Sequence, residues 1–240
     1  MLIKRAIQVI LLLLLIAVVY ALMARGQDTD TIKLATLEQR LSQLEGQIAL
    51  LEDSKAIKRL QRAYGYYVDK GLSHEVAGLF AEQATVEIGG YGVYAGKDHV
   101  ASFYRRLLGD RLQNGHLNNH LIMQGVVHVA PDGRTAKGRW RALIQQGEYG
   151  KSAVWSEGPY ENEYVKDNGV WKFSKVHWYM TFAAPYDPGW HKAPQPMPGP
   201  YADLPPDRPP SVDYQAYPAA YLPPYHYPNP VTGRETGVPQ

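Results

Sequence analysis

The sequence of 240 residues contains no cysteine, which excludes disulfide bonds, thiolate nucleophiles and zinc sites built from cysteine ligands. Proline is also scarce before residue 184, because 16 of the 18 prolines lie in the last 57 residues. A strong excess of one charge sign is missing as well: the formal net charge is +2, and Lys and Arg are scattered among Asp and Glu. Without a basic stripe to neutralise phosphates, we expect no nucleic acid partner.

A long apolar run opens the chain. Lys4 and Arg5 precede an almost unbroken apolar segment from Ala6 to Ala24, the order of charges and apolar residues that is typical of an export signal. Residues 1–26 are therefore predicted to be a cleaved signal peptide or a membrane anchor, because about 20 apolar residues also suffice for a spanning helix. Both alternatives predict an exported protein, either periplasmic, anchored in the inner membrane and facing the periplasm, or extracellular.

Residues 30–53 carry a regular apolar repeat. Six positions recur at spacings of three and four, with polar residues between them: Leu34, Leu37, Leu41, Leu44, Ile48 and Leu51. This repeat predicts a short coiled coil and with it a homo-oligomer. The alternative is a single amphipathic helix lying on its own domain. We expect the repeat to end at Asp53, with Ser54 as the N-cap of a new helix.

Residues 54–183 are predicted to form one α+β domain. Helices are expected from Ser54 to about Lys70, from Ser73, and over residues 97–108, with Gly71 ending the first of them. Period-two segments predict strands at residues 85–88, 121–129, 135–145, 153–166 and 170–183. A curved antiparallel sheet packed on three helices would leave a pocket on its covered face.

The last segment, residues 184–240, is rich in proline and tyrosine. Repeated prolines block helices and central strands, so one alternative is a disordered linker. Partial order is the prediction that we favour, because five tyrosines between residues 214 and 227 supply large apolar rings.

Two stretches of the middle domain carry a family resemblance. The first is Ile57-Lys-Arg-Leu-Gln-Arg-Ala-Tyr64-Gly-Tyr-Tyr-Val-Asp69-Lys-Gly, followed by a helix and Ala84-Thr-Val-Glu-Ile, and the second is Gly138-Arg-Trp140. They resemble the SnoaL-like branch of the NTF2-like superfamily, which includes bile-acid dehydratases and, more remotely, scytalone dehydratase. The resemblance implies an NTF2-like cone over residues 54–183 and a reaction that needs no cofactor. An acidic residue that bile-acid dehydratases carry shortly after Gly-Arg-Trp has no counterpart in residues 141–145, which leaves substrate and reaction open.

The same resemblance implies three catalytic residues, Tyr64, Asp69 and His120. His120 would shuttle a proton, Asp69 would orient its imidazole, and Tyr64 would stabilise an enolate-like oxygen. Asp69 is also singled out by its position, since a carboxylate in the last turn of a helix faces the negative end of the helix dipole. Solvent exposure of Asp69 and core packing of Tyr64 are the structural alternatives.

Aromatic side chains of the same domain are candidates for substrate binding: Tyr67, Trp140, Trp155, Tyr160 and His177. If they face the cavity, the ligand should be a hydrophobic small molecule that is flat or polycyclic. We expect no metal, because no histidine pair has the spacing of a metal site on one helix. The leading hypothesis is a dehydratase or isomerase acting on a polycyclic or ketone-bearing compound. The alternatives are a non-catalytic binder of hydrophobic ligands and an oligomerisation unit with a vestigial cavity.

Overall fold

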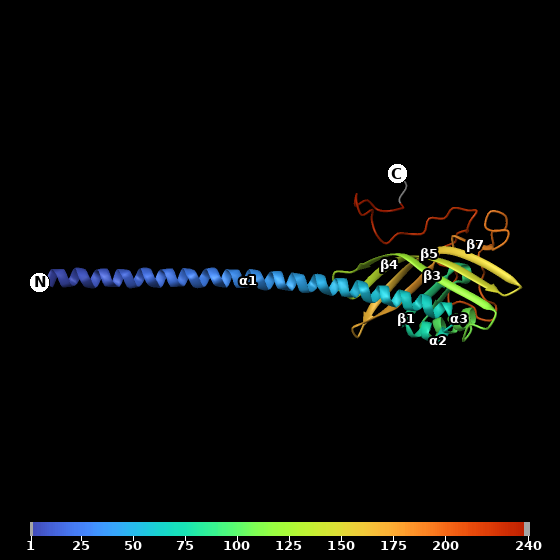
Figure 1. Ribbon diagram of the computed structural model, residues 1–240, viewed down its shortest axis with the longest axis horizontal. Helices are drawn as coiled ribbons and strands as arrows, with labels where there is room; N and C mark the ends of the chain where they lie inside the picture. Colours follow the sequence, from blue (N-terminus) through green and yellow to red (C-terminus); the bar gives the residue numbers. More distant parts are fainter. Residues whose placement is uncertain (1, 238–240) are drawn as a thin grey trace. The chain divides into compact units, whose positions relative to one another are not determined.

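The computed structural model describes residues 2–237, and it describes side chains in residues 10–23 and 33–237. The chain divides into two units, Met1–Ala49 and Leu50–Gln240. Helix α1 (Leu2–Asp69) begins in the first unit and ends in the second (Figure 1). The predicted break at Asp53 and Ser54 is wrong, because both residues stay helical. The carboxylate of Asp53 does not cap a helix; it accepts hydrogen bonds from Trp171 Nε1 at 2.8 Å and Lys166 Nζ at 2.7 Å.

The first unit is helical throughout its described part. The described leucines and isoleucines of the repeat between residues 34 and 51 are 50% to 65% exposed. Among the residues described with side chains, none belongs to a helix long and apolar enough to span a bilayer. The predicted signal or anchor, residues 1–26, lies partly outside those residues.

The second unit is built on one curved, unclosed sheet. Its strands follow the order β2-β1-β6-β5-β4-β3, and β7 pairs with β5. The strands are β1 (Phe80–Ile88), β2 (Val93–Ala95), β3 (His116–Val129), β4 (Thr135–Glu148), β5 (Ser152–Asp167), β6 (Val170–Trp178) and β7 (Phe182–Pro185). All pairings are antiparallel except β1 with β6, which is parallel. The predicted α+β architecture is confirmed, with this one parallel pairing as an addition.

Two strands differ from the prediction in ways that matter for the pocket. Strand β3 begins at His116 rather than Leu121, so His120 lies inside a strand and not in a loop. The predicted strand 170–183 is two strands, because residues 179–181 leave the β6 ladder before β7 begins at Phe182. That interruption places Met180 beside the cavity.

Helices cover one face of the sheet. The end of α1 packs there with α2 (Ser73–Gly78) and α3 (Lys97–Leu108). The bounds of α3 match the predicted helix, and a one-turn 3₁₀ helix, η1 (Gly89–Tyr91), links β1 to β2. Gly71 adopts a φ of +64°, the left-handed conformation expected of a residue that ends a helix.

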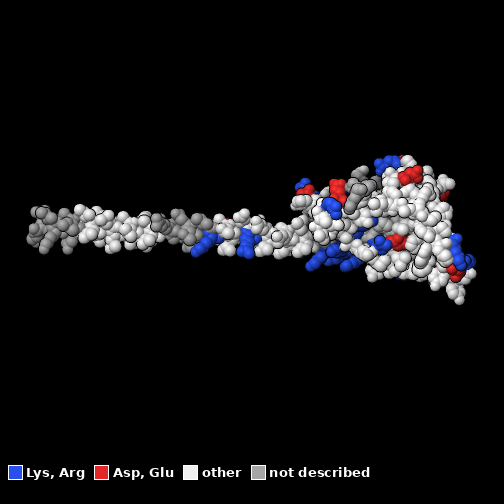
Figure 2. Space-filling model, turned by 90° about the horizontal axis from the view of Figure 1, so that it is seen from above, with Lys and Arg blue, Asp and Glu red and all other residues white. Residues whose placement is uncertain are grey.

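The proline- and tyrosine-rich extension packs on its own globular unit. Tyr214 Oη accepts a hydrogen bond from Met180 N at 2.7 Å and its ring stacks on Tyr221. Buried Glu87 accepts two hydrogen bonds from Ser211, at 2.7 Å from the backbone N and 2.6 Å from Oγ. On the face of the globular unit seen in Figure 2, charges of both signs appear among a majority of uncharged residues.

Candidate active site

A cavity of about 220 Å³ lies between the helices and the sheet of the globular unit. Its lining is mostly apolar and aromatic, with a few polar groups, as in ligand sites of proteins generally. The strands contribute Ile88, Asn118, His120, Ile144, Gln146, Val154, Ser156, Tyr160, Trp178 and Ala183, and the segment between β6 and β7 contributes Met180. The helices contribute Tyr64, Val68, Tyr91, Tyr104, Leu107 and Leu108.

A chain of hydrogen bonds crosses the cavity wall. Tyr64 Oη lies 3.1 Å from Tyr104 Oη and 3.3 Å from Tyr160 Oη. Tyr160 Oη in turn lies 3.0 Å from Nε2 of His120. The rings of Tyr64 and His120 are edge to face, with centroids 6.1 Å apart. Three hydroxyls and one imidazole therefore form a continuous path along which hydrogen bonds, and protons, can be rearranged.

Four elements bring these groups together. Tyr64 comes from α1, Tyr104 from α3, His120 from β3 and Tyr160 from β5. In a strand, alternate residues face the same side, so Tyr160 shares the covered face with Ser156, which also lines the cavity. All four members of the chain are at most 8% exposed.

The end of α1 is tied to β3 by two side chains. Asn118 Nδ2 donates to the carbonyl oxygen of Val68 at 2.8 Å, in the last turn of the helix, and the same oxygen accepts the backbone N–H of Gly71 at 3.1 Å. The carboxylate of Asp69 accepts a hydrogen bond from the backbone N–H of His120. The predicted contact between Asp69 and the imidazole of His120 is therefore wrong. Asp69 binds the backbone N–H of His120, and Tyr160 is the hydrogen-bond partner of the imidazole ring.

Burial sets the protonation states in the cavity. Loss of solvation lowers the pKa of His120 to about 4, so its imidazole is neutral at pH 7. Burial likewise raises the pKa of Tyr64, Tyr104 and Tyr160, which keeps all three hydroxyls protonated. Burial raises the pKa of half-buried Asp69, while the bond from His120 N–H and the charge of Lys70 oppose that rise. A neutral base beside protonated hydroxyls can accept a proton and donate hydrogen bonds in one site.

The C-terminal extension supplies one wall of the cavity. Gln195, Pro196 and Pro198 line it, and the backbone N of Gln195 donates to the carbonyl oxygen of Ala183 at 2.7 Å. Gly90 lies directly under this wall: a Cβ at Gly90 would come within 2.2 Å of the Pro198 oxygen. The wall therefore depends on a glycine at that position.

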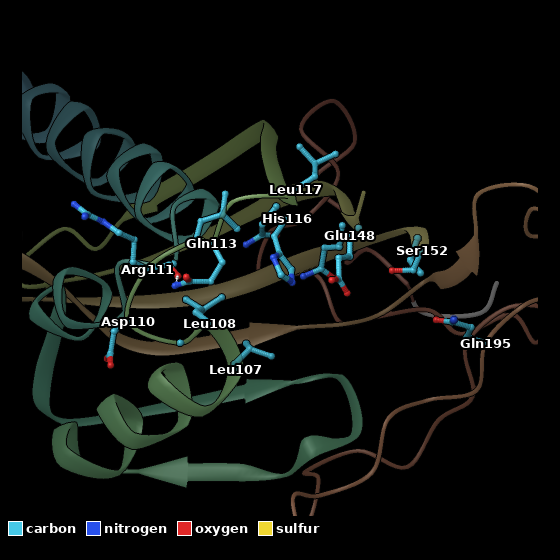
Figure 3. A pocket seen from close by; sticks show the side chains of 17 residues that line it. Leu107, Leu108, Asp110, Arg111, Gln113, His116, Leu117, Glu148, Ser152 and Gln195 are labelled. Atoms are coloured by element: carbon cyan, nitrogen blue, oxygen red, sulfur yellow. Dashed lines mark hydrogen bonds between the residues drawn. The ribbon is translucent and has the colours of Figure 1, made fainter. Parts of the chain in front are cut away.

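An outer groove of about 650 Å³ adjoins the cavity. The two share Leu107, Leu108, Asn118, Gln146, Val154 and Gln195. Figure 3 shows Leu107 and Leu108 on α3 at one side of the groove, with Glu148 and Gln195 on other segments around it. The shared residues mark the groove as an entrance to the cavity.

The structure brings Tyr64, His120 and Tyr160 together at the cavity and leaves the other five predicted residues, including Asp69, outside its lining. Trp155 follows the opposite parity from Tyr160 on β5 and contacts Tyr186 and Trp190 instead. Tyr67 packs at the edge of the core.

Trp140 and His177 have other partners. The indole Nε1 of Trp140 donates to Tyr164 Oη at 2.8 Å, deeper in the core. His177 stacks on Tyr179 with ring centroids 3.8 Å apart and lies 3.6 Å from the carboxylate of Glu87, under the extension. Neither residue is placed to touch a ligand in this cavity.

Sequence reasoning missed several lining residues. Asn118 and Ser156 share strand parity with His120 and Tyr160, so parity could have identified them once the strand bounds were known. Tyr104 follows Phe103 on the apolar face of a predicted helix. Nothing local marks Gln195 or Pro198, because their position depends on long-range packing.

Metal binding has no support among the side chains in residues 10–23 and 33–237. That part of the chain contains no group of three or more His, Asp or Glu side chains arranged to hold an ion.

Comparison with known proteins identifies relatives of the globular unit. A family model described as a SnoaL-like domain matches residues 49–177, more than half of the chain. No curated protein matches the sequence. Crystal structures of similar fold are known, however, at sequence identities below 25%.

Three of these structures each have a TM-score of 0.51. A scytalone dehydratase-like protein of Novosphingobium aromaticivorans is 22% identical, with a TM-score of 0.51 over 65% of this chain and 97% of that protein. A hexachlorocyclohexane dehydrochlorinase of Novosphingobium barchaimii is 22% identical, with a TM-score of 0.51 over 58% and 93% of the two chains. A type 2 enzyme of the same name is 24% identical, with a TM-score of 0.51 over 58% and 92%. These likenesses establish the fold.

Proposed function

This chain belongs to the SnoaL-like domain family, and from that premise we propose that its cavity binds a hydrophobic, ketone-bearing small molecule and catalyses its dehydration or isomerisation without a cofactor. The observation that carries the proposal is the buried chain of three tyrosine hydroxyls ending at His120 Nε2. The three similar structures reported above bear names of elimination enzymes, one scytalone dehydratase-like protein and two dehydrochlorinases, which agrees with this reaction class.

The residues have distinct roles in this reaction. Neutral His120 accepts a proton from the carbon next to the ketone, while hydroxyls of Tyr64 and Tyr160 donate hydrogen bonds to the oxygen where negative charge develops. The electron pair of the broken C–H bond forms a C=C bond as the β-hydroxyl leaves. The proton on His120 then joins the departing hydroxide, so that the products are an unsaturated ketone and water.

The size of the cavity restricts the substrate. A volume of about 220 Å³ is below the usual range of roughly 300 to 1,000 Å³ for drug-sized ligands. We therefore propose one or two fused rings inside the cavity, with any larger part of a polycyclic substrate lying in the outer groove. Export remains part of the proposal, supported by the apolar segment that follows Lys4 and Arg5.

A non-catalytic binder is the second candidate function, and one observation favours it. Asp69 contacts the backbone of His120 and not its ring, so the imidazole lacks a carboxylate to raise its basicity. With a pKa of about 4, His120 is a weak base. A carrier would use the same cavity and outer groove without turnover.

The deciding experiment measures binding and turnover together on the full chain in detergent. A panel of one-ring, two-ring and polycyclic β-hydroxy ketones is titrated by tryptophan fluorescence, and loss of water is followed by mass spectrometry. Saturable binding with formation of the unsaturated ketone supports an enzyme. Saturable binding of the same compounds, with neither loss of water nor an isomer that chromatography separates from the substrate, overturns the catalytic proposal and leaves the carrier.

The wall formed by the extension provides a further test of the ligand site. We expect Gly90→Ala to raise the ligand Kd about tenfold, because the new methyl group displaces the Pro198 oxygen that it would otherwise approach to 2.2 Å. Gly199→Ala is the matched control, since a Cβ at Gly199 meets nothing within 4 Å. Equal affinity of the two variants would show that the ligand does not use this wall.

A further inference from the structure

The repeat on α1 has a second pattern beside its leucines. Lettering Leu34 as heptad position a places leucine or isoleucine at every a and d position: Leu34, Leu37, Leu41, Leu44, Ile48 and Leu51. The two flanking positions differ in charge: e is always glutamate, and g is a cation in two of its three occurrences. Position e holds Glu38, Glu45 and Glu52, and position g holds Lys33, Arg40 and Gln47.

The charges distinguish the two orientations of a paired helix. In a parallel, in-register pair, each g residue faces the e residue of the following heptad on the other chain, five positions later. Arg40 then faces Glu45 of the second copy, and Lys33 faces Glu38 of the second copy. In an antiparallel pair, e faces e and g faces g, so glutamates oppose glutamates and cations oppose cations. Only the parallel arrangement brings opposite charges together.

The width of the apolar stripe indicates the number of strands. Leucine or isoleucine occupies every a and d position, and e and g are charged or polar, which gives the narrow seam of a two-stranded coil. Outside a and d, residues 33–52 hold one further leucine, Leu50 at c. Ile48 at a, between Leu44 and Leu51 at d, is the combination that favours two strands. The seam side chains are 50% to 65% exposed, so a second copy has apolar surface to bury.

We propose that residues 33–52 pair with the same residues of a second copy in a parallel, in-register, two-stranded coiled coil. The glutamates at e and the cations at g select both the partner and the orientation. This association does not depend on the proposed reaction of the pocket.

Cross-linking of the full chain tests the orientation. The sequence has no cysteine, so Leu37→Cys introduces the only thiol. In a parallel, in-register pair the two introduced thiols meet, and oxidation should convert more than half of the chains to a disulfide dimer. In an antiparallel pair residue 37 would face a residue near 48, roughly 16 Å away along the helix. Gln39→Cys, on the outer f position, is the matched control and should cross-link weakly.

Exchange of the two charges tests whether Arg40 of one copy pairs with Glu45 of the second. The dissociation constant of the dimer is measured by sedimentation of the full chain in detergent at low salt. Arg40→Glu or Glu45→Arg alone places like charges together and should raise the Kd about tenfold, whereas the double variant restores opposite charges and should return within about twofold of the original. The apolar N-terminal segment is the same in all four proteins. Weak cross-linking at residue 37, equal cross-linking at 37 and 39, or a double variant as weak as the single variants would overturn the proposal.

Discussion

His120→Gln is expected to lower turnover of a β-hydroxy ketone by roughly 10² to 10⁴, the usual contribution of a positioned acid–base group. Glutamine can still form a hydrogen bond with Tyr160, whose hydroxyl lies 3.0 Å from the imidazole Nε2, so the wall of the cavity should persist. The glutamine side chain cannot accept a proton, however. We therefore expect the ligand Kd to change by less than threefold while kcat falls.

The pH profile of kcat/KM tests the role of His120 more directly. Since burial lowers the pKa of His120 to about 4, the active neutral form persists down to that pH, and the acid limb should lie near 4 instead of near 6.5. His74→Gln, at an exposed position on α2, is the control and should leave the profile unchanged. An acid limb near neutrality in the wild type, or a kcat insensitive to His120→Gln, would remove His120 from the mechanism.

Asp69 acts in this scheme as a positioning residue. Asp69→Asn keeps an oxygen that can accept the backbone N–H of His120, whereas Asp69→Ala removes the acceptor from the end of α1. We expect kcat to fall several times further in Asp69→Ala than in Asp69→Asn. If both variants lost activity equally, the charge of Asp69 and not its hydrogen bond would be what the reaction needs.

Local patterns in the sequence were sufficient for much of the fold. The helix 97–108 lies between two glycines with positive φ, Gly96 and Gly109, and its predicted bounds are correct. The start of β3 is not evident from the sequence, because Asn118 and Asn119 are polar residues of the kind that is common in loops. Asn118 is nevertheless buried, and its side chain is hydrogen-bonded to the carbonyl oxygen of Val68. A buried polar side chain whose hydrogen-bond partner lies 50 residues away leaves no signal in the local sequence.

The site was predictable only in part for the same reason. The motif of the first helix identified Tyr64, and strand parity would have separated Tyr160 from Trp155. Parity could not place His177, which is buried on the other face of the sheet under Tyr179 and the extension. The extension closes both faces, so the environments of His120 and His177 depend on residues that prolines and tyrosines alone do not locate.

Acidification from pH 7 to pH 4 is expected to remove on the order of 5 kcal/mol of unfolding free energy from the globular unit. Burial lowers the pKa of His120 to about 4 and that of His177 to about 3, while both would titrate near 6.5 in the unfolded chain. Below pH 6.5 the unfolded state therefore binds more protons, and each histidine costs about 1.4 kcal/mol per pH unit until its folded pKa is reached. The raised pKa of Asp69 acts in the opposite direction and offsets a small part of this loss.

Urea unfolding followed by tryptophan fluorescence at several pH values measures this loss, because all five tryptophans lie between residues 140 and 190. His177→Phe keeps an aromatic ring against Tyr179 but cannot be protonated, so the pH slope between 6.5 and 4 should fall by about half. The imidazole proton resonances of the native protein provide a readout that needs no variant: those of at least two histidines, His120 and His177, should not titrate between pH 7.5 and 5. If the resonances of His120 and His177 titrated near 6.5, the two buried imidazoles would be accessible to protons in the folded state, and the acid sensitivity would have to come from carboxylates instead.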